Sequence, residues 1–132
     1  MKTREDIESY LIRTGIDHEE IGEAMWLVES ADEPDGAGQR PRIVVSVTDP
    51  LVLLRASLGT APSDEKERLS AFQSLLQRNA TDLVHGAYGL EEDEVILSDS
   101  MELENLDYSE FLASLESLSI ALASHRLQPA TD

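Results

Sequence analysis

The stretch LVHGAYGLEEDEVILSD, residues 83–99, decides the fold because two apolar segments in it meet at an acidic turn. Residues 83–88 are short, apolar-rich and flanked by turn-forming residues, which is typical of a strand. Residues 94–99 alternate in side-chain character, as a second strand does. The acids at 91–94 stay hydrated at the turn and protect the end of the sheet from aggregation. The stretch predicts a β-hairpin rather than a metal loop or a catalytic turn.

Upstream of this hairpin the sequence predicts three further strands. Residues 42–48 and 51–58 both alternate apolar and polar side chains, and Asp49-Pro50 between them favours a tight turn. Residues 19–30 contain the consecutive apolar run Met25 to Val28, which indicates a single strand that is covered on both faces.

Three helices complete the pattern. The first runs from a cap at Thr3 to Gly15, the second starts at a cap at Asp64, and the third extends from near Asp107 to about Arg126. The order α-β-β-β-α-β-β-α predicts an α+β fold with a five-stranded antiparallel sheet and three helices. We expect a single domain over residues 1–126 and a flexible tail at 127–132.

Composition narrows the classes of function. The chain of 132 residues has 10 basic and 27 acidic residues and a formal net charge of −17. This charge repels nucleic acids and anionic membranes. No cysteine is present, so thiolate metal sites and thiol catalysis are excluded. The start has no signal-peptide pattern, and no apolar run approaches the roughly 20 residues of a membrane span. We therefore expect a soluble cytoplasmic protein.

Signals for catalysis and for metal binding are weak. His18, His85 and His125 have no metal-ligand spacing, and no serine lies in a nucleophile-elbow context. His85 fits a hydrogen-bonded structural histidine on the strand at 83–88 better than a ligand. The acidic loop at 31–41 lacks the spacing of a calcium loop. We expect no enzymatic activity and no cofactor, catalytic residue or metal site.

The more informative feature is the presence of apolar residues on both faces of the predicted strands. Helices on one face would leave the other face apolar, and contiguous apolar patches are rarely left bare. If the helices instead divide between the two faces, no partner is needed. The candidate residues for contact with a second copy or a client protein are Met25, Trp26, Val28, Leu51, Leu53, Leu69 and Phe72.

The segment LLQRNATDLVHGAYGLEEDEVILSDSMELENLDYSEFLASL, residues 75–115, resembles the type III secretion chaperone-like superfamily. The resemblance rests on the apolar pattern together with Asn79, Gly86 and Gly89, and the order of elements agrees along the whole chain. The superfamily includes CesT-type secretion chaperones and YbjN-type proteins. The resemblance implies the five-stranded fold, a homodimer and no catalytic activity. For the secretion chaperones it also implies binding of an extended segment of a client protein. The loop at 30–41 is longer than a compact secretion chaperone needs, so a YbjN-type role stays open.

These observations predict a non-catalytic protein-binding module, chaperone-like or regulatory in the YbjN sense, that forms a homodimer. It would bind a polypeptide segment through apolar sheet and helix surfaces, by strand addition or groove contact. The alternative is a regulatory domain that senses a ligand or a divalent ion through the acidic residues at 30–41 or 91–94.

Overall fold

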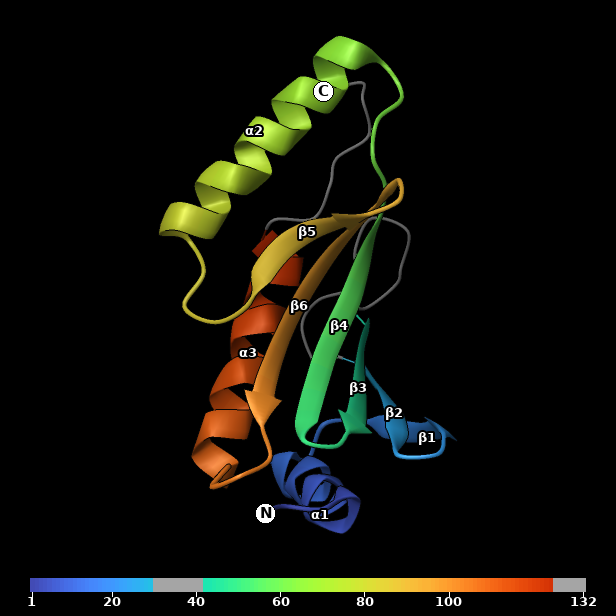
Figure 1. Ribbon diagram of the computed structural model, residues 1–132, viewed down its shortest axis with the longest axis vertical. Helices are drawn as coiled ribbons and strands as arrows, with labels where there is room; N and C mark the ends of the chain where they lie inside the picture. The colour runs from blue at the N-terminus through green and yellow to red at the C-terminus, as the bar shows by residue number, and fades with distance from the viewer. Residues whose placement is uncertain (30–41, 125–132) are drawn as a thin grey trace.

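The computed structural model describes residues 1–29 and 42–124, which form one antiparallel sheet and three helices (Figure 1). The elements are α1 (Arg4–Thr14), β1 (His18–Gly22), β2 (Met25–Glu29), β3 (Arg42–Thr48), β4 (Leu51–Thr60), α2 (Glu65–Thr81), β5 (Ala87–Glu91), β6 (Glu94–Glu102) and α3 (Tyr108–Ser124). The strands lie in the order β1-β2-β3-β4-β6-β5. The α+β class and the helices are confirmed, whereas the expectation of five strands is wrong because the sheet has six.

The additional strand comes from the segment that the sequence predicts as one strand over residues 19–30. That segment forms the β1–β2 hairpin, which reverses at Glu23 and Ala24, and Ala24 has a left-handed φ of 54°. β1 is an edge strand that pairs with β2. The one aliphatic side chain of β1, Ile21, is 46% exposed. β1 therefore lacks the alternation of apolar and polar residues by which a strand is recognised in a sequence.

The other hairpins follow the sequence more closely. β3 and β4 join through Asp49-Pro50 as predicted, with Thr48 opposite Leu51. The hairpin in residues 83–99 is also confirmed, but its first strand starts at Ala87 rather than at residue 83. Residues 82–86 connect α2 to β5 instead, and the prediction that His85 lies on a strand is wrong.

The predicted helix caps are present. Thr3 and Asp6 form a reciprocal capping box at α1, and α1 ends at Gly15 with a φ of 74°. The Asp64 carboxylate accepts a hydrogen bond from the backbone N–H of Glu67 at the start of α2. Hydrogen bonds from the Thr3 backbone and hydroxyl lower the pKa of Asp6, so this cap is charged at neutral pH.

One hydrophobic core holds the helices to the sheet. Because successive strand residues point to opposite faces, the buried set alternates along each strand and defines one inner face. The helices contribute Ile7, Leu11, Leu75, Phe111, Leu115 and Leu118 to the same cluster as inner-face residues such as Val45, Leu54 and Leu97. All three helices therefore contact the same face of the sheet.

Polar contacts fix the helices in this position. The buried Ser114 hydroxyl of α3 donates to the Asp99 carboxylate of β6 at 2.6 Å. The Tyr10 hydroxyl of α1 donates to the carbonyl oxygen of Leu106, just before α3, at 3.0 Å. A buried polar group that has a partner avoids its desolvation penalty, so these bonds favour one docking geometry of each helix.

Gly86 is required by both backbone conformation and packing. Its φ is +86°, and an added Cβ would lie 2.9 Å from Leu118 Cδ1 and 2.9 Å from the Ser98 carbonyl oxygen. Gly15 also has a positive φ, but an added Cβ there meets nothing within 4 Å. Substitution of Gly15 by alanine therefore introduces backbone strain alone, whereas substitution of Gly86 introduces backbone strain and a steric clash.

We predict that Gly86→Ala destabilises the fold by about 1–3 kcal/mol more than Gly15→Ala, because only the first substitution forces atoms into contact. Denaturant-induced unfolding of the two variants measures the difference. Equal losses of stability would contradict the close packing of α3 against the connection before β5.

Candidate functional site

The structure divides the predicted binding residues into core and surface positions. Trp26 and Val28 are each 1% exposed and belong to the core, and the Arg4 guanidinium of α1 lies 5.7 Å from the centre of the Trp26 ring. They are therefore not at the surface of this subunit, contrary to their selection as contact residues. The sequence-based choice failed at these two positions because a run of four apolar residues does not show which alternate pair faces the helices.

The opposite face of the sheet forms the first candidate surface, called here the outer sheet face. Its apolar side chains are Met25, Leu27, Val44, Leu51, Leu53 and Ile96. Strand register places Met25 opposite Ser46, and Ser46 opposite Leu53. Met25 is 37% exposed, and the others are partly buried. Within residues 1–29 and 42–124, no helix covers this face.

Two ion pairs lie at the periphery of the outer sheet face. The Arg55 guanidinium lies 2.7 Å from the Glu91 carboxylate, and Arg42 lies 3.5 Å from Glu29. Both pairs join neighbouring or nearby strands and are largely exposed, so each contributes little to stability. Register places Glu102 opposite Leu51 on the same face, whereas the neighbours of Leu53 are Ser46 and Ser100. An apolar segment can therefore contact the area around Leu53 without burying an isolated ion of the described residues.

The second candidate surface is the exposed side of α2, called here the α2 surface and made of Leu69, Phe72 and Leu76. Leu69 is 62% and Leu76 is 67% exposed, while Phe72 is partly buried. Their spacing of three and four residues places them on one stripe of the helix. Leu75, next to this stripe, is buried against the sheet.

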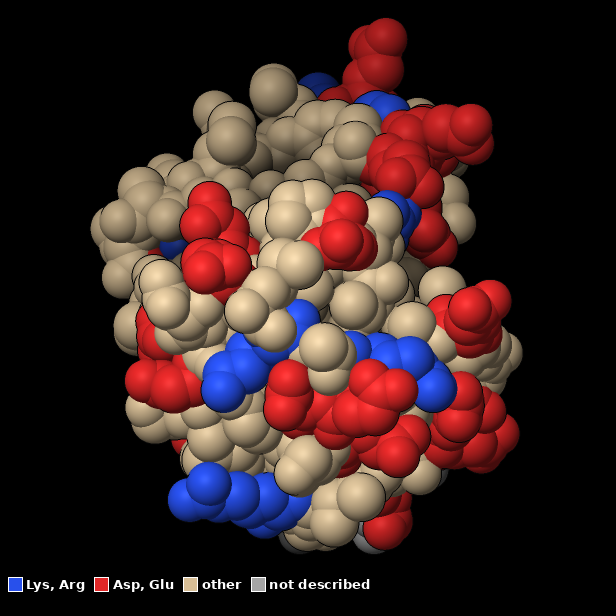
Figure 2. All heavy atoms as spheres, turned by 60° about the horizontal axis from the view of Figure 1, so that its bottom comes forward, with Lys and Arg blue, Asp and Glu red and all other residues tan. Residues whose placement is uncertain are grey.

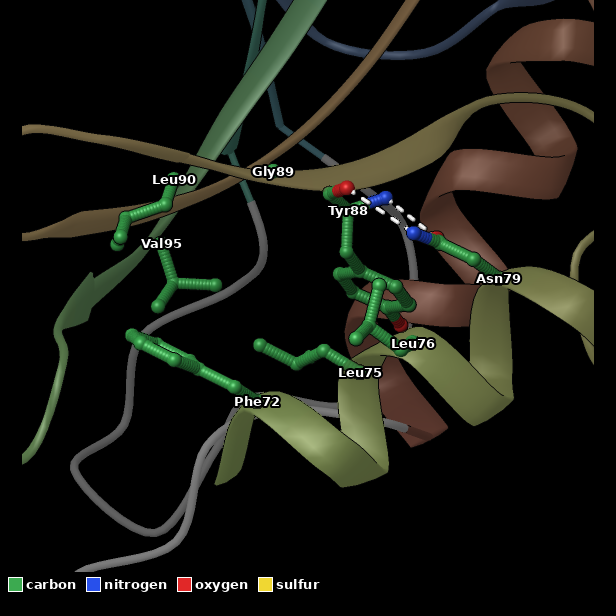
Figure 3. A pocket seen from close by; sticks show the side chains of 8 residues that line it. All are labelled: Phe72, Leu75, Leu76, Asn79, Tyr88, Gly89, Leu90 and Val95. Atoms are coloured by element: carbon green, nitrogen blue, oxygen red, sulfur yellow. Dashed lines mark hydrogen bonds between the residues drawn. The ribbon is translucent and has the colours of Figure 1, made fainter. Parts of the chain in front are cut away.

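A hollow of about 220 Å³ lies between the α2 surface and the β5–β6 hairpin. Its lining residues are Phe72, Leu75, Leu76, Asn79, Tyr88, Gly89, Leu90 and Val95. Figure 3 shows the apolar side chains of α2 directed toward Leu90 and Val95, with Asn79 at one side. The lining is almost entirely apolar, so the hollow is suited to an aliphatic or aromatic side chain.

The acidic groups are not arranged as a metal centre in the part of the chain that the structure describes. In the 91–94 turn, Glu91 pairs with Arg55, Asp93 pairs with Arg68, and Glu94 accepts a hydrogen bond from Ser57. These acids are thus directed toward different partners. The acidic loop at 30–41 and the tail at 127–132, on which other predictions were made, lie outside the described residues.

The histidines are separated in the structure as well. His18 Nδ1 lies 3.0 Å from the carbonyl oxygen of Ile16, whereas His85 is exposed and its backbone N–H donates to the Ser117 hydroxyl. His125 lies outside the described residues. Among the described residues, no helix is long and apolar enough to cross a membrane.

Comparisons with known proteins identify relatives of this fold. The CesT_Tir_1 family model matches residues 1–128. The heterodimeric complex ExoU–SpcU from the type III secretion system of Pseudomonas aeruginosa contains a similar chain, with a TM-score of 0.67 and 17% identity, over 89% of this chain and 93% of that chain. YbjN from E. coli, a proposed transcription regulator, gives a TM-score of 0.64 and 16% identity, over 97% of both chains. A search of curated proteins finds no match.

The different positions of Trp26 and Leu53 lead to a stability test. We predict that Trp26→Ala costs about 3–5 kcal/mol because it opens a cavity in the core, whereas Leu53→Ala costs less than about 2 kcal/mol. Thermal or denaturant unfolding measures both. If Leu53→Ala proved as damaging as Trp26→Ala, the outer sheet face would be a second core rather than a surface.

Proposed function

Because this chain belongs to the CesT_Tir_1 family, we propose that it is a non-catalytic protein-binding module with a chaperone-like or regulatory role. The observation that carries the proposal is the outer sheet face, which lacks a helical cover among the described residues although it is apolar at Leu27, Val44, Leu51 and Leu53. An antiparallel sheet with one solvated face ordinarily has polar side chains there. A polypeptide segment that lies across this face would remove the apolar side chains from water.

The related structures support a role in protein binding. The ExoU–SpcU structure is a heterodimeric complex, so a chain of this fold associates with a different protein there. YbjN supports the regulatory form of the proposal. Both similarities are below 25% identity, and they establish the fold rather than a particular client. The described residues of this chain contribute the two apolar surfaces on which the assignment depends.

We assign the two surfaces to different partners. The α2 surface is a stripe on a single helix, and such a stripe can pair with its own copy across a two-fold axis. Burial of Leu69 and Leu76 at about 1.5–3 kcal/mol each, in both copies, would drive this association. The outer sheet face is broader and flatter, and it stays available for a client in such a dimer. The homodimer would act in the cytoplasm.

The first prediction of this assignment concerns oligomeric state. We expect wild-type protein to be a dimer in solution and Leu69→Glu/Leu76→Glu to be a monomer, because the carboxylates would have to be buried at the interface. Multi-angle light scattering measures the mass. Ser70→Glu is the matched control, since this exposed position on the same helix is not three or four residues from any member of the stripe. A monomeric wild-type protein would contradict the dimer.

The second prediction concerns the client. Leu53→Lys introduces a charge at the centre of the outer sheet face and is expected to abolish cross-linking of a client in cells that express the chain. Ser63→Lys, at an exposed position before α2, is the matched control and should leave the cross-linked product unchanged. Circular dichroism establishes that both variants are folded. Equal capture by wild-type, Leu53→Lys and Ser63→Lys proteins would rule out the outer sheet face as the client site.

A further inference from the structure

A second hollow, of about 310 Å³, lies between α3 and residues 82–86, which connect α2 to β5. It is called here the α3 hollow, and its lining includes Val84, Glu116, Ser117 and Ile120. Figure 1 shows the connection beside α3 and away from β1 and β2. No residue of the outer sheet face or of the α2 surface lines the α3 hollow. It is therefore a third surface, made of different residues.

The lining of the α3 hollow is more apolar than polar, and part of it is bare. Val84, on the connection, is 84% exposed, which is more than any other large hydrophobic side chain of the described residues. Ile120, on α3, is 63% exposed, whereas Ala121 beside it is buried. Contact with an aliphatic side chain would remove Val84 and Ile120 from water. Neither side chain belongs to the core cluster, so a partner can cover both without rearranging the fold.

Hydrogen bonds hold the connection against α3. The Ser117 hydroxyl of α3 accepts a hydrogen bond from the His85 N–H at 3.2 Å and donates one to the His85 carbonyl oxygen at 3.4 Å. The next residue, Gly86, packs so closely that an added Cβ would lie 2.9 Å from Leu118 Cδ1 of α3. Because the two walls are joined in this way, they need little ordering when a ligand binds.

The charges at the α3 hollow favour a basic partner. Glu116 is exposed and has no ion-pair partner among the described residues. Asp82 is the other acid of the lining, which contains no lysine or arginine. Figure 2, which brings the α1 end of the molecule forward, shows Asp and Glu in several groups with fewer Lys and Arg between them. The net charge of −17 repels a second copy of the chain, whereas a cation on a partner is attracted.

The positions of Glu116 and Ile120 set the spacing of the groups that a partner must present. Residues four apart lie on the same side of a helix, with about 5–6 Å between their Cβ atoms. On an extended segment, side chains two residues apart point to the same side and lie about 7 Å apart. An extended segment can therefore place an aliphatic side chain at Ile120 and a cation at Glu116 when the two residues are two positions apart.

We propose that the α3 hollow binds an extended segment of another protein in which an aliphatic residue lies two positions from a lysine or arginine. The aliphatic side chain contacts Val84 and Ile120, and the cation pairs with Glu116. The inference goes beyond the proposed function, because a client on the outer sheet face leaves the α3 hollow free. The chain can in this way hold two polypeptide segments at once.

The required side chains are tested with a capped synthetic peptide, Gly-Arg-Ser-Leu-Ser-Arg-Gly, which has an arginine two positions from leucine on either side. Methyl NMR spectra of the full-length protein, titrated with this peptide, measure binding. We expect the Val84 and Ile120 methyl signals to shift and the Leu53 and Leu76 methyl signals to stay in place. Control peptides with serine for leucine, or with glutamate for both arginines, should shift none of them. Absence of shifts at Val84 and Ile120, or equal shifts with a control peptide, would overturn the inference.

The contribution of each wall is tested with variants. Glu116→Gln keeps the size of the side chain and should weaken binding of the arginine peptide about threefold, as loss of one exposed ion pair does. Ile120→Ser removes the aliphatic wall and should weaken binding roughly tenfold. Glu5→Gln, at an exposed position on α1, removes the same charge away from the hollow and should bind as wild type does. Equal weakening in Glu5→Gln and Glu116→Gln would show attraction by net charge alone and overturn the site.

Further variants separate this site from folding and from the outer sheet face. Circular dichroism establishes whether Ile120→Ser is folded, and Val84→Ser tests the other wall at a position outside the helices. Wild-type affinity of the arginine peptide for folded Val84→Ser protein would overturn the inference. Leu53→Lys should bind the peptide as wild type does, and weakened binding in this variant would contradict a separate site. Client capture that depends on Leu53 is measured independently, so failure at the α3 hollow is distinguishable from failure of the proposed function.

Discussion

Because side chains alternate along the strands, this sheet has two faces with different residues, and all three helices cover one of them. The register carries this division across the sheet: Trp26 lies opposite Val45, and Val45 opposite Leu54, all on the inner face. The next row of residues, with Met25, Ser46 and Leu53, lies on the outer face. A shift of register by one residue would exchange the two rows, so the packing of the core also determines which apolar residues remain outside.

The position of α2 follows from a second constraint. Near its C-terminal end α2 is held to β5 by the paired hydrogen bonds between Asn79 and Tyr88 and by the burial of Leu75. Toward its N-terminal end, Arg68 reaches Asp93 at the β5–β6 turn, but Leu69 on the same helix remains exposed. Figure 1 shows α2 beside β5, away from α1. A helix anchored in this way presents Leu69 and Leu76 to solvent on one stripe, which suits an interface between helices.

The sequence predicts those elements whose signals are local. The β3–β4 turn at Asp49-Pro50 and the caps at Thr3 and Asp64 depend on residues within a few positions of each other, and the structure has all of them. β1 could not be predicted, because its conformation comes from pairing with β2 and its side chains are almost all polar. The placement of Trp26 inside and Leu53 outside depends on where the helices dock, and no local pattern encodes that. Asn79 was noticed as part of a resemblance, but its bonds to Tyr88 appear only when α2 and β5 are in place.

The large acidic excess and the apolar surfaces are compatible because they occupy different positions. Net charge of −17 keeps copies of the chain apart at a distance, yet near Leu53 the Arg55 charge is matched by Glu91. Contact around Leu53, whose neighbours in register are Ser46 and Ser100, therefore removes apolar surface from water without stripping an unpaired ion of its hydration. Asp17 and Glu19, which have no ion-pair partner among the described residues, instead lie at the rim of this face, where charge steers the approach of a partner more than it adds to final affinity. A partner must thus be apolar where it crosses the sheet near Leu53.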